Sequence, residues 1–129
     1  MTVSNEEFSA LVKLPATQRY AYLIKRVADQ ESLWSLKSPD GWVLFADGNG
    51  KELVPIWSDE RFASACATGI WRGAEPQPIS LDVWQTRWLP GIARDGRKVV
   101  VFPTPADRGC VVECDKLAED LTAEADKYE

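Results

Sequence analysis

Two turn signals close together in the first half of the chain constrain its fold most strongly. Ser38-Pro39-Asp40-Gly41 and Asp47-Gly48-Asn49-Gly50 contain the proline, aspartate and glycine combinations that favour tight turns. They separate three short runs rich in strand-forming residues, at 33–36, 42–45 and 53–57. We therefore predict a three-stranded antiparallel meander over residues 33–57. Because Pro55 has no N–H group, its strand should lie at a sheet edge or bulge at this residue.

Helical periodicity flanks the expected meander on both sides. Ser4 and Glu7 match the capping box that begins a helix, and 17–30 repeats apolar residues at the spacing of one helix face. A later helix should end or kink at Pro90-Gly91. The residues expected to cap the first four helices are Ser4, Thr17, Ser58 and Ser80.

The remaining segments complete one α+β domain. An apolar strand is expected at 98–102, another strand at 109–112 and a final helix at 115–128. The predicted order is α-α-β-β-β-α-α-β-β-α, with helices packed on an about five-stranded, mainly antiparallel sheet. We assign this single domain to residues 1–129, because no repeat or long linker divides the chain.

The chain contains no histidine, which removes most of the familiar catalytic and metal-binding arrangements. Ser-His-Asp catalysis, Cys-His catalysis and the HExxH zinc site all require it. No glycine-rich phosphate-binding motif is present, and Asp59, Glu60 and Asp82 each have a structural role in the first turn of a helix. In the turn at 47–50, Lys51 stands where a calcium loop needs an oxygen ligand. We therefore expect no catalytic residue, no metal and no cofactor.

Three cysteines at irregular spacing indicate free thiols rather than a disulfide framework. Cys110 and Cys114 would lie about 13 Å apart along a strand, beyond the roughly 7 Å that a disulfide tolerates. Burial of Cys66 in a helix would disfavour its use as a nucleophile. Residues 1–14 contain two glutamates and no apolar run, unlike a signal peptide, and no stretch is apolar enough to span a membrane. We predict a cytoplasmic protein.

Negative charge is concentrated at the C-terminal end of the chain. Seven acids and two lysines lie between residues 113 and 129, so this segment carries the whole net charge of −5. A sequence pI near 4.8 argues against nucleic acid or an anionic membrane as a partner. The last helix, with Asp120 and Glu124, is instead a candidate docking face for a basic protein partner.

Six tryptophans are present, and five of them lie at positions typical of a core or half-buried face. Trp71 is the exception, because it lies beside Arg72 in an irregular connection that contains glycine and proline. Such a pair is typical of an interface anchor, although Trp71 could instead close the edge of the core. Arg87 and Arg94 belong to a basic cluster that would bind an anionic partner or, as we favour, consist of solvated side chains, some of which pair with the acidic last helix. The cluster consists of Arg87, Arg94, Arg97, Lys98 and Arg108.

Several short strings carry a family resemblance. The more specific ones are Trp88-Leu89-Pro90-Gly91 and Val101-Phe102-Pro103-Thr104-Pro105, and the others are Gly41-Trp42, Val54-Pro55-Ile56-Trp57, Ile79-Ser80-Leu81 and the C-terminal Leu117, Leu121 and Tyr128-Glu129. Together they resemble a small bacterial family known as domain of unknown function 2750. The resemblance covers Tyr20 to the end and leaves residues 1–14 as an N-terminal helical arm outside it. It implies no activity, cofactor or catalytic residue.

A second likeness concerns architecture alone. The strand that ends in Leu53-Val54-Pro55-Ile56-Trp57 and leads into a capped helix is similar to part of the N-terminal domain of SseB-type bacterial proteins. That likeness implies an adaptor or secretion-linked module rather than an enzyme.

These features favour a small protein-binding or adaptor domain, and an immunity-type role that blocks a toxin belongs to this class. The alternative is a small-ligand-binding domain with a tryptophan-lined pocket, or a weak enzyme that uses carboxylates or Cys66. An aromatic pocket of about 300 Å³ or more with convergent polar groups would favour the ligand, whereas a flat face around Trp71 or the last helix would favour a protein partner. The candidate binding residues are Trp71, Arg72, Arg87, Arg94, Asp120 and Glu124.

Overall fold

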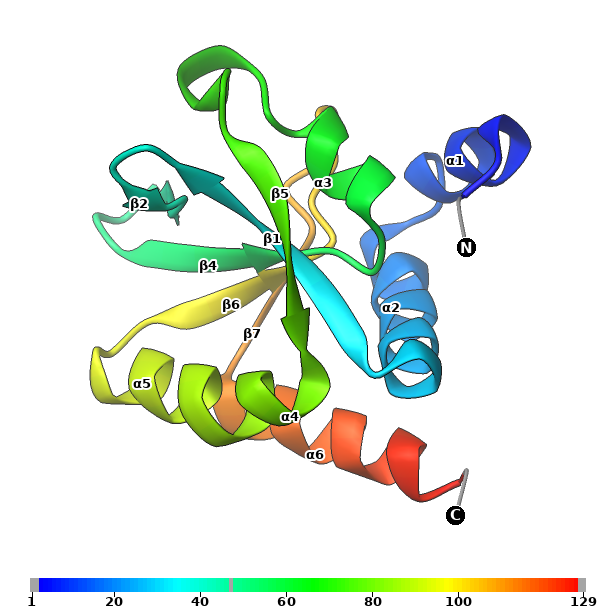
Figure 1. Cartoon of the computed structure of the whole chain (residues 1–129), viewed down its shortest axis with the longest axis vertical. Coiled ribbons are helices and arrows are strands. Elements are labelled where there is room, and N and C mark those ends of the chain that lie inside the picture. The colour runs from blue at the N-terminus through cyan, green and yellow to red at the C-terminus, as the bar shows by residue number, and fades with distance from the viewer. Residues whose placement is uncertain (1–2, 47, 128–129) are drawn as a thin grey trace.

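The computed structural model describes residues 3–46 and 48–127 and has the α+β architecture expected from the sequence (Figure 1). A 3-10 turn, η1, and a π-helical turn, η2, join the regular elements. In chain order the elements are α1 (Asn5–Val12), α2 (Ala16–Gln30), β1 (Ser32–Ser38), β2 (Gly41–Trp42), β3 (Phe45–Ala46), β4 (Glu52–Ile56), α3 (Glu60–Ala65), η1 (Gly69–Trp71), β5 (Glu75–Ser80), α4 (Leu81–Val83), η2 (Trp84–Trp88), α5 (Leu89–Arg94), β6 (Lys98–Val101), β7 (Cys110–Val112) and α6 (Cys114–Asp126).

The strands form two small sheets instead of the single sheet predicted. One has the order β2-β1-β5 and the other the order β3-β4-β6-β7. All neighbouring strands are antiparallel except β4 and β6, which run parallel. The meander predicted over 33–57 is divided, because β1 pairs with β2 at one edge and with β5 at the other. Trp34 and Trp57 connect the sheets through two backbone hydrogen bonds of 2.9 Å.

The strand β5 is absent from the sequence prediction because Pro76 and Pro78 argue against a strand. Pro76 lies opposite Leu36 of β1, and the Leu36 carbonyl accepts a hydrogen bond from Val43 on the far side of β1. Residues opposite each other in an antiparallel ladder either bond to each other or both face away. The nitrogen of Pro76, and by the two-residue period that of Pro78, therefore faces out from a sheet edge, where no ladder bond is lost.

Pro55 lies inside β4, between β3 and β6, and the expected edge position is wrong. The carbonyl of Ile56 accepts a hydrogen bond from the N–H of Phe102 at 2.9 Å, so the backbone of Pro55 faces the other side of β4. There β3 pairs only with the first two residues of β4, and the Pro55 carbonyl accepts instead from the Ser35 hydroxyl at 2.7 Å. The proline occupies the place where the ladder opens between the two sheets.

The helical segment 81–94 runs through Pro90 instead of ending there. Ser80 caps the segment, as predicted. Proline removes one helical hydrogen bond, and its ring crowds the preceding turn of a regular helix. In η2, directly before Pro90, the N–H of Leu89 binds the Trp84 carbonyl five residues back. The wider π-helical turn accommodates the proline ring and the lost hydrogen bond, so the chain continues as α5.

The starts of two other helices differ from the prediction. Pro15 rather than Thr17 precedes α2, where the missing N–H of a proline costs no helical hydrogen bond. Asp59 rather than Ser58 occupies the N-cap of α3, but its side chain makes no capping hydrogen bond. The carboxylate binds elsewhere, as described below. At α1 the predicted capping box of Ser4 is confirmed.

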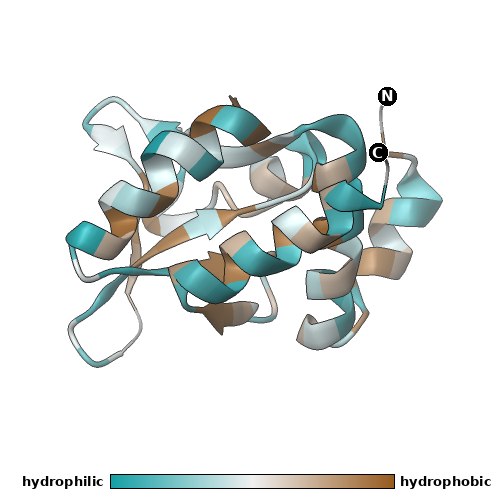
Figure 2. Ribbon diagram, turned by 90° about the horizontal axis from the view of Figure 1, so that it is seen from below, coloured by the Kyte–Doolittle hydropathy of each residue, from teal (hydrophilic) through white to brown (hydrophobic). Residues whose placement is uncertain are grey.

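Helices cover the strands on more than one side, with α5 and α6 below them and α1 and α2 to their right in Figure 1. Figure 2 shows hydrophobic stretches in the central strands and a mixture of hydrophilic and hydrophobic residues along the helices that surround them. Large aromatic side chains fill the interior, and α2 packs against α6. The largest fully buried residues include Trp57, Trp84, Phe62 and Phe102.

A buried arginine joins α2 to the turn that follows β6. Arg19 is 1 % exposed, and its guanidinium donates to the Phe102 carbonyl at 3.0 Å and to the Asp107 carboxylate at 2.7 Å. Phe102 has a left-handed backbone with φ 54°, and a Cβ at Gly109 would lie 2.6 Å from the Val101 carbonyl. The hydrogen bond from Arg19 lowers the pKa of Asp107. This turn therefore has a structural role that accounts for its unusual sequence.

Candidate functional site

The predicted anchor at Trp71 is packed against the domain. Its ring stacks on Phe45 with centroids 4.3 Å apart and an interplanar angle of 21°, and it is half-buried. Arg72 is exposed beside it. The side chain that projects from this loop is Ile70, which is 86 % exposed. The alternative noted for Trp71, closure of the core edge, describes its position better than an interface anchor does.

The acids predicted to form a docking face on the last helix are engaged within the chain. Asp120 accepts hydrogen bonds from the Tyr20 hydroxyl at 2.5 Å and from Lys116 at 3.0 Å, and Glu124 pairs with Lys127 at 3.2 Å. Partial burial alone would raise the pKa of Asp120, but its two hydrogen bonds lower it overall. Burial and the neighbouring Asp120 raise the pKa of Tyr20. The hydrogen bond from Tyr20 joins α2 to α6, whereas the two lysine pairs lie within the last helical segment.

The basic cluster separates into paired and unpaired cations. Lys98 pairs with Glu113 at the start of α6, whereas Arg97 pairs with Glu52 and Asp95. The predicted pairing with the acidic last segment therefore holds for Lys98 and not for Arg97. Two further members, Arg87 and Arg94, are exposed and form no ion pair with any described residue.

The thiol of Cys66 is poorly suited to nucleophilic chemistry. It is 6 % exposed and donates a hydrogen bond to the Pro103 carbonyl at 3.3 Å. Burial raises the pKa of Cys66 to about 11, so the thiolate is scarce at neutral pH. Cys110 and Cys114 are free as well. Within the described ranges, no cluster of three or more metal-ligating side chains occurs.

An open groove of about 840 Å³ lies between α1, α3 and the start of β1, and we call it the polar groove. It combines two aromatic side chains with carboxylate, amide, hydroxyl and guanidinium groups. Its lining residues are Val3, Phe8, Gln30, Ser32, Trp34, Asp59, Glu60, Arg61, Ser64 and Ala65.

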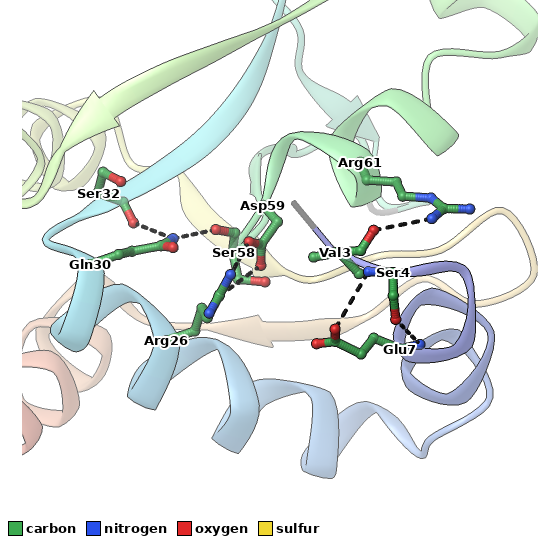
Figure 3. A network of polar contacts seen from close by, with 9 residues as sticks. All are labelled: Val3, Ser4, Glu7, Arg26, Gln30, Ser32, Ser58, Asp59 and Arg61. Atoms are coloured by element: carbon green, nitrogen blue, oxygen red, sulfur yellow. Dashed lines mark hydrogen bonds and ion pairs between the residues drawn. The ribbon is translucent and has the colours of Figure 1, made fainter. Parts of the chain in front are cut away.

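A buried carboxylate lies in the wall of the polar groove (Figure 3). Asp59 is 6 % exposed, and both of its oxygens accept hydrogen bonds from Arg26, the shortest at 2.8 Å from Nη2. The hydrogen bond from Arg26 to Asp59 raises the pKa of Arg26, with partial burial opposing it. The amide of Gln30 donates to the carbonyls of Ser32 and Ser58 and so fixes the end of α2 to both neighbouring segments. The groove is therefore held open by a rigid polar network.

The opposite wall of the polar groove is formed by the N-terminal helix. Phe8 stacks on Phe62 of α3 with centroids 5.4 Å apart, and the guanidinium of Arg61 lies 4.5 Å from the Phe8 ring centre. Arg61 also donates to the Val3 carbonyl at 3.2 Å. The predicted helical arm is thus packed on the domain and contributes to the groove.

A second, shallower groove of about 430 Å³ lies where β2 meets η2 and α5, and we call it the tryptophan groove. Trp42 and Trp88 meet edge to face there, with ring centroids 4.6 Å apart. Arg87, one of the predicted binding residues, lines it, whereas Arg94 does not. The lining residues are Trp42, Leu44, Val54, Arg87, Trp88, Gly91, Ile92, Asp95 and Arg97.

The sequence offers a tryptophan-lined pocket as an alternative but locates neither groove, for identifiable reasons. Trp42 and Trp88 have the spacing of core residues in their own segments, and only the contact between segments makes a groove. Asp59 was assigned to a helix first turn, because the partner that turns its carboxylate away, Arg26, lies 33 residues earlier. The one usable signal was the cation Arg87 directly before Trp88.

The comparisons with known proteins concern the family alone. No curated protein shows a significant match to the chain. No helix in the described parts of the chain is both long and apolar enough to cross a membrane. The likeness to the SseB N-terminal domain stays a prediction. A family model described as "Protein of unknown function (DUF2750)" matches residues 20–121, most of the chain, and includes both tryptophans of the tryptophan groove. The chain therefore belongs to the DUF2750 family.

Proposed function

We propose that this protein is a small-ligand-binding domain and that the polar groove is its binding site. The observation that carries the proposal is a groove of about 840 Å³ that is lined by a buried carboxylate and by the aromatic faces of Phe8 and Trp34. Ligand sites typically combine a concave, mostly apolar wall with a few placed polar groups, in volumes of roughly 300–1,000 Å³.

The groove favours a ligand that donates hydrogen bonds. Asp59 and Glu60 supply carboxylate oxygens, and Ser32 and Ser64 add hydroxyl groups. The one lining cation, Arg61, is engaged by the Phe8 ring and the Val3 carbonyl. Acceptors therefore outnumber available donors, and the flat aromatic walls fit a ring. We propose a ring-bearing ligand rich in hydroxyl or amino groups.

The arrangement supports binding rather than catalysis. Both oxygens of the Asp59 carboxylate accept hydrogen bonds from Arg26, so this side chain is engaged in an ion pair within the protein. No cysteine lines the groove. These features weigh against the weak carboxylate- or Cys66-based enzyme considered from the sequence.

The test is a thermal-shift and calorimetric screen with three probe classes, namely monosaccharides, ribonucleosides and aliphatic polyamines. Monosaccharides or ribonucleosides should raise the melting temperature of the wild-type protein, whereas the polyamines, which carry no ring, should not. Ser64→Phe places a ring in the groove from an exposed position on α3 and should abolish that shift. Ser9→Phe, at an exposed position on α1 outside the lining, is the matched control and should keep it. Binding that survives Ser64→Phe unchanged would remove the polar groove from the proposal.

A further inference from the structure

The tryptophan groove leaves part of its apolar lining accessible to solvent. Trp42 is 37 % exposed although it contacts Trp88, and it is among the few large apolar side chains described as exposed. Leu44, Val54 and Ile92 line the same hollow. Aromatic side chains that stay partly solvated around a shallow apolar hollow are typical of the centre of a protein interface.

Local structure fixes one side of this groove. Trp88 ends the π-helical turn η2, and Gly91 follows on α5 with no atom within 4 Å of a Cβ placed on it. π-Helical turns are rare and occur frequently at functional sites. Because Gly91 has no side chain, the groove stays open beside Trp88, and a partner chain can approach the helix backbone there.

The charges around the groove favour a carboxylate. Arg97 is satisfied by Glu52 and Asp95, which neutralise it. Arg87 forms no ion pair with a described residue, and the ammonium of Lys37 lies 5.5 Å from the Trp42 ring centre. Two cations therefore remain beside the tryptophans to meet a negatively charged group.

We infer that the tryptophan groove is a docking site for a short segment of a partner protein that places a large apolar side chain beside an aspartate or glutamate. The apolar side chain packs on Trp42 and Trp88 in the hollow that Leu44 and Ile92 also line, and the carboxylate pairs with Arg87. A second copy of this chain fits less well, because the net charge of −5 opposes self-association. A volume of about 430 Å³ suits one large side chain with its flanking backbone, at the low end of the roughly 300–1,000 Å³ of ligand sites.

The experiment selects random linear peptides displayed on phage against the wild-type domain, with Trp42→Ala as the counter-selection. The selected sequences should combine an aromatic or large aliphatic residue with an acid. Synthetic versions carrying a fluorophore are then titrated with the domain by fluorescence anisotropy. Circular dichroism and thermal melts of every variant establish that it is folded.

The charge contact has a matched pair of variants. Arg87→Glu should weaken peptide binding about tenfold or more, because it replaces attraction by repulsion beside a hydrophobic contact. Arg94→Glu changes the same charge at an exposed position outside the groove and should change affinity less than about twofold. A peptide in which lysine replaces the acid should regain affinity for Arg87→Glu.

Several results would overturn the inference. No enrichment over Trp42→Ala, or equal effects of the two arginine variants, would remove the groove as a peptide site. Sedimentation that shows a dimer dissolved by Arg87→Glu would make a second copy the occupant, and indole-3-carboxylate binding as tightly as the peptides would make it a small-molecule site. Ser64→Phe should leave peptide binding unchanged, so this inference and the proposed function can fail separately.

Discussion

The two grooves of this domain differ in how their charges are satisfied. In the polar groove two of the lining charged side chains bind other groups of the chain, since Asp59 accepts from Arg26 and Arg61 donates to the Val3 carbonyl. In the tryptophan groove Arg87 has no ionic partner among the described residues, and Trp42 stays 37 % exposed. A carboxylate paired with an arginine of its own chain is fixed in place, whereas a cation without an ionic partner is available to an incoming acid. This difference agrees with the two proposals, a small-ligand site in the first groove and a docking site in the second.

The grooves also differ in where their walls come from. The tryptophan groove is built from residues that the family model matches, whereas Val3 and Phe8 of the polar groove precede residue 20, where the match begins. The polar groove therefore depends on how well the N-terminal helix packs on α3. Measurements of the free energy of unfolding can distinguish the groove that depends on the N-terminal helix from the groove that does not.

The largest expected effect comes from the buried ion pair. Asp59→Ala should lower the free energy of unfolding by about 2–3 kcal/mol, because it leaves Arg26 partly buried without its partner. Urea denaturation measures the change. Glu113→Ala removes an exposed pair with Lys98 and should cost at most about 1 kcal/mol. The Arg26→Ala, Asp59→Ala double variant should lose less stability than the sum of the two single losses, because the pair is coupled. If its loss equals that sum, the two side chains are not coupled and the rigid-network interpretation is wrong.

A smaller effect should follow from loosening the N-terminal wall. Phe8→Ala removes a half-buried ring from Phe62 and from Arg61 and should cost about 2 kcal/mol, below the 3–5 typical of a fully buried phenylalanine. Amide hydrogen exchange should rise in α1 and leave η2 and α5 unchanged. Lys13→Ala, at an exposed position after α1, is the control. Faster exchange throughout the chain would show that α1 is part of the cooperative core.

Truncation in the tryptophan groove should cost less again. Trp42→Ala loses the edge contact with Trp88 and the cation contact with Lys37, which together should contribute about 1 kcal/mol. Ile70→Ala removes the most exposed large apolar side chain and should leave stability nearly unchanged. If Trp42→Ala costs 3 kcal/mol or more, on the scale of a buried aromatic, Trp42 is a core residue and not a contact surface.

Local signals predicted much of the fold. The capping box of Ser4, the cap at Ser80 and the central apolar strand β6 depend on neighbouring residues, and all three are found. The two sheets and β5 depend on pairing between distant segments, which local patterns do not encode. Pro55 predicts an edge strand and Pro76 predicts no strand, and the structure contradicts both. The reason is the same, because the missing N–H group of each proline faces no ladder partner.

The sites were harder to predict than the fold, for a related reason. Of the predicted binding residues, Arg87 alone lines either groove. The acidic surroundings of Asp120 predict a carboxylate that is available to a partner, but the hydroxyl of Tyr20, a hundred residues away, donates a hydrogen bond to it. The loop position of Trp71 predicts a ring that is available to a partner, but this ring stacks on Phe45. A side chain's availability depends on contacts between elements, so composition and loop position are weak guides to it.

The smallest expected effect tests whether the open space at Gly91 in the tryptophan groove is a requirement of binding or of folding. Gly91 has an ordinary helical backbone with open space where an added methyl group would lie, so Gly91→Ala should stabilise the domain by about 0.4–1 kcal/mol through a less flexible unfolded chain. Gly96→Ala, at φ 73°, is the opposite control and should destabilise. Thermal melts measure both. If Gly91→Ala stabilises the fold and also weakens the selected peptides, the glycine serves the approach of a partner chain. If Gly91→Ala destabilises the domain instead, the glycine is needed by the turn from η2 into α5, and the groove is open there for reasons of folding alone.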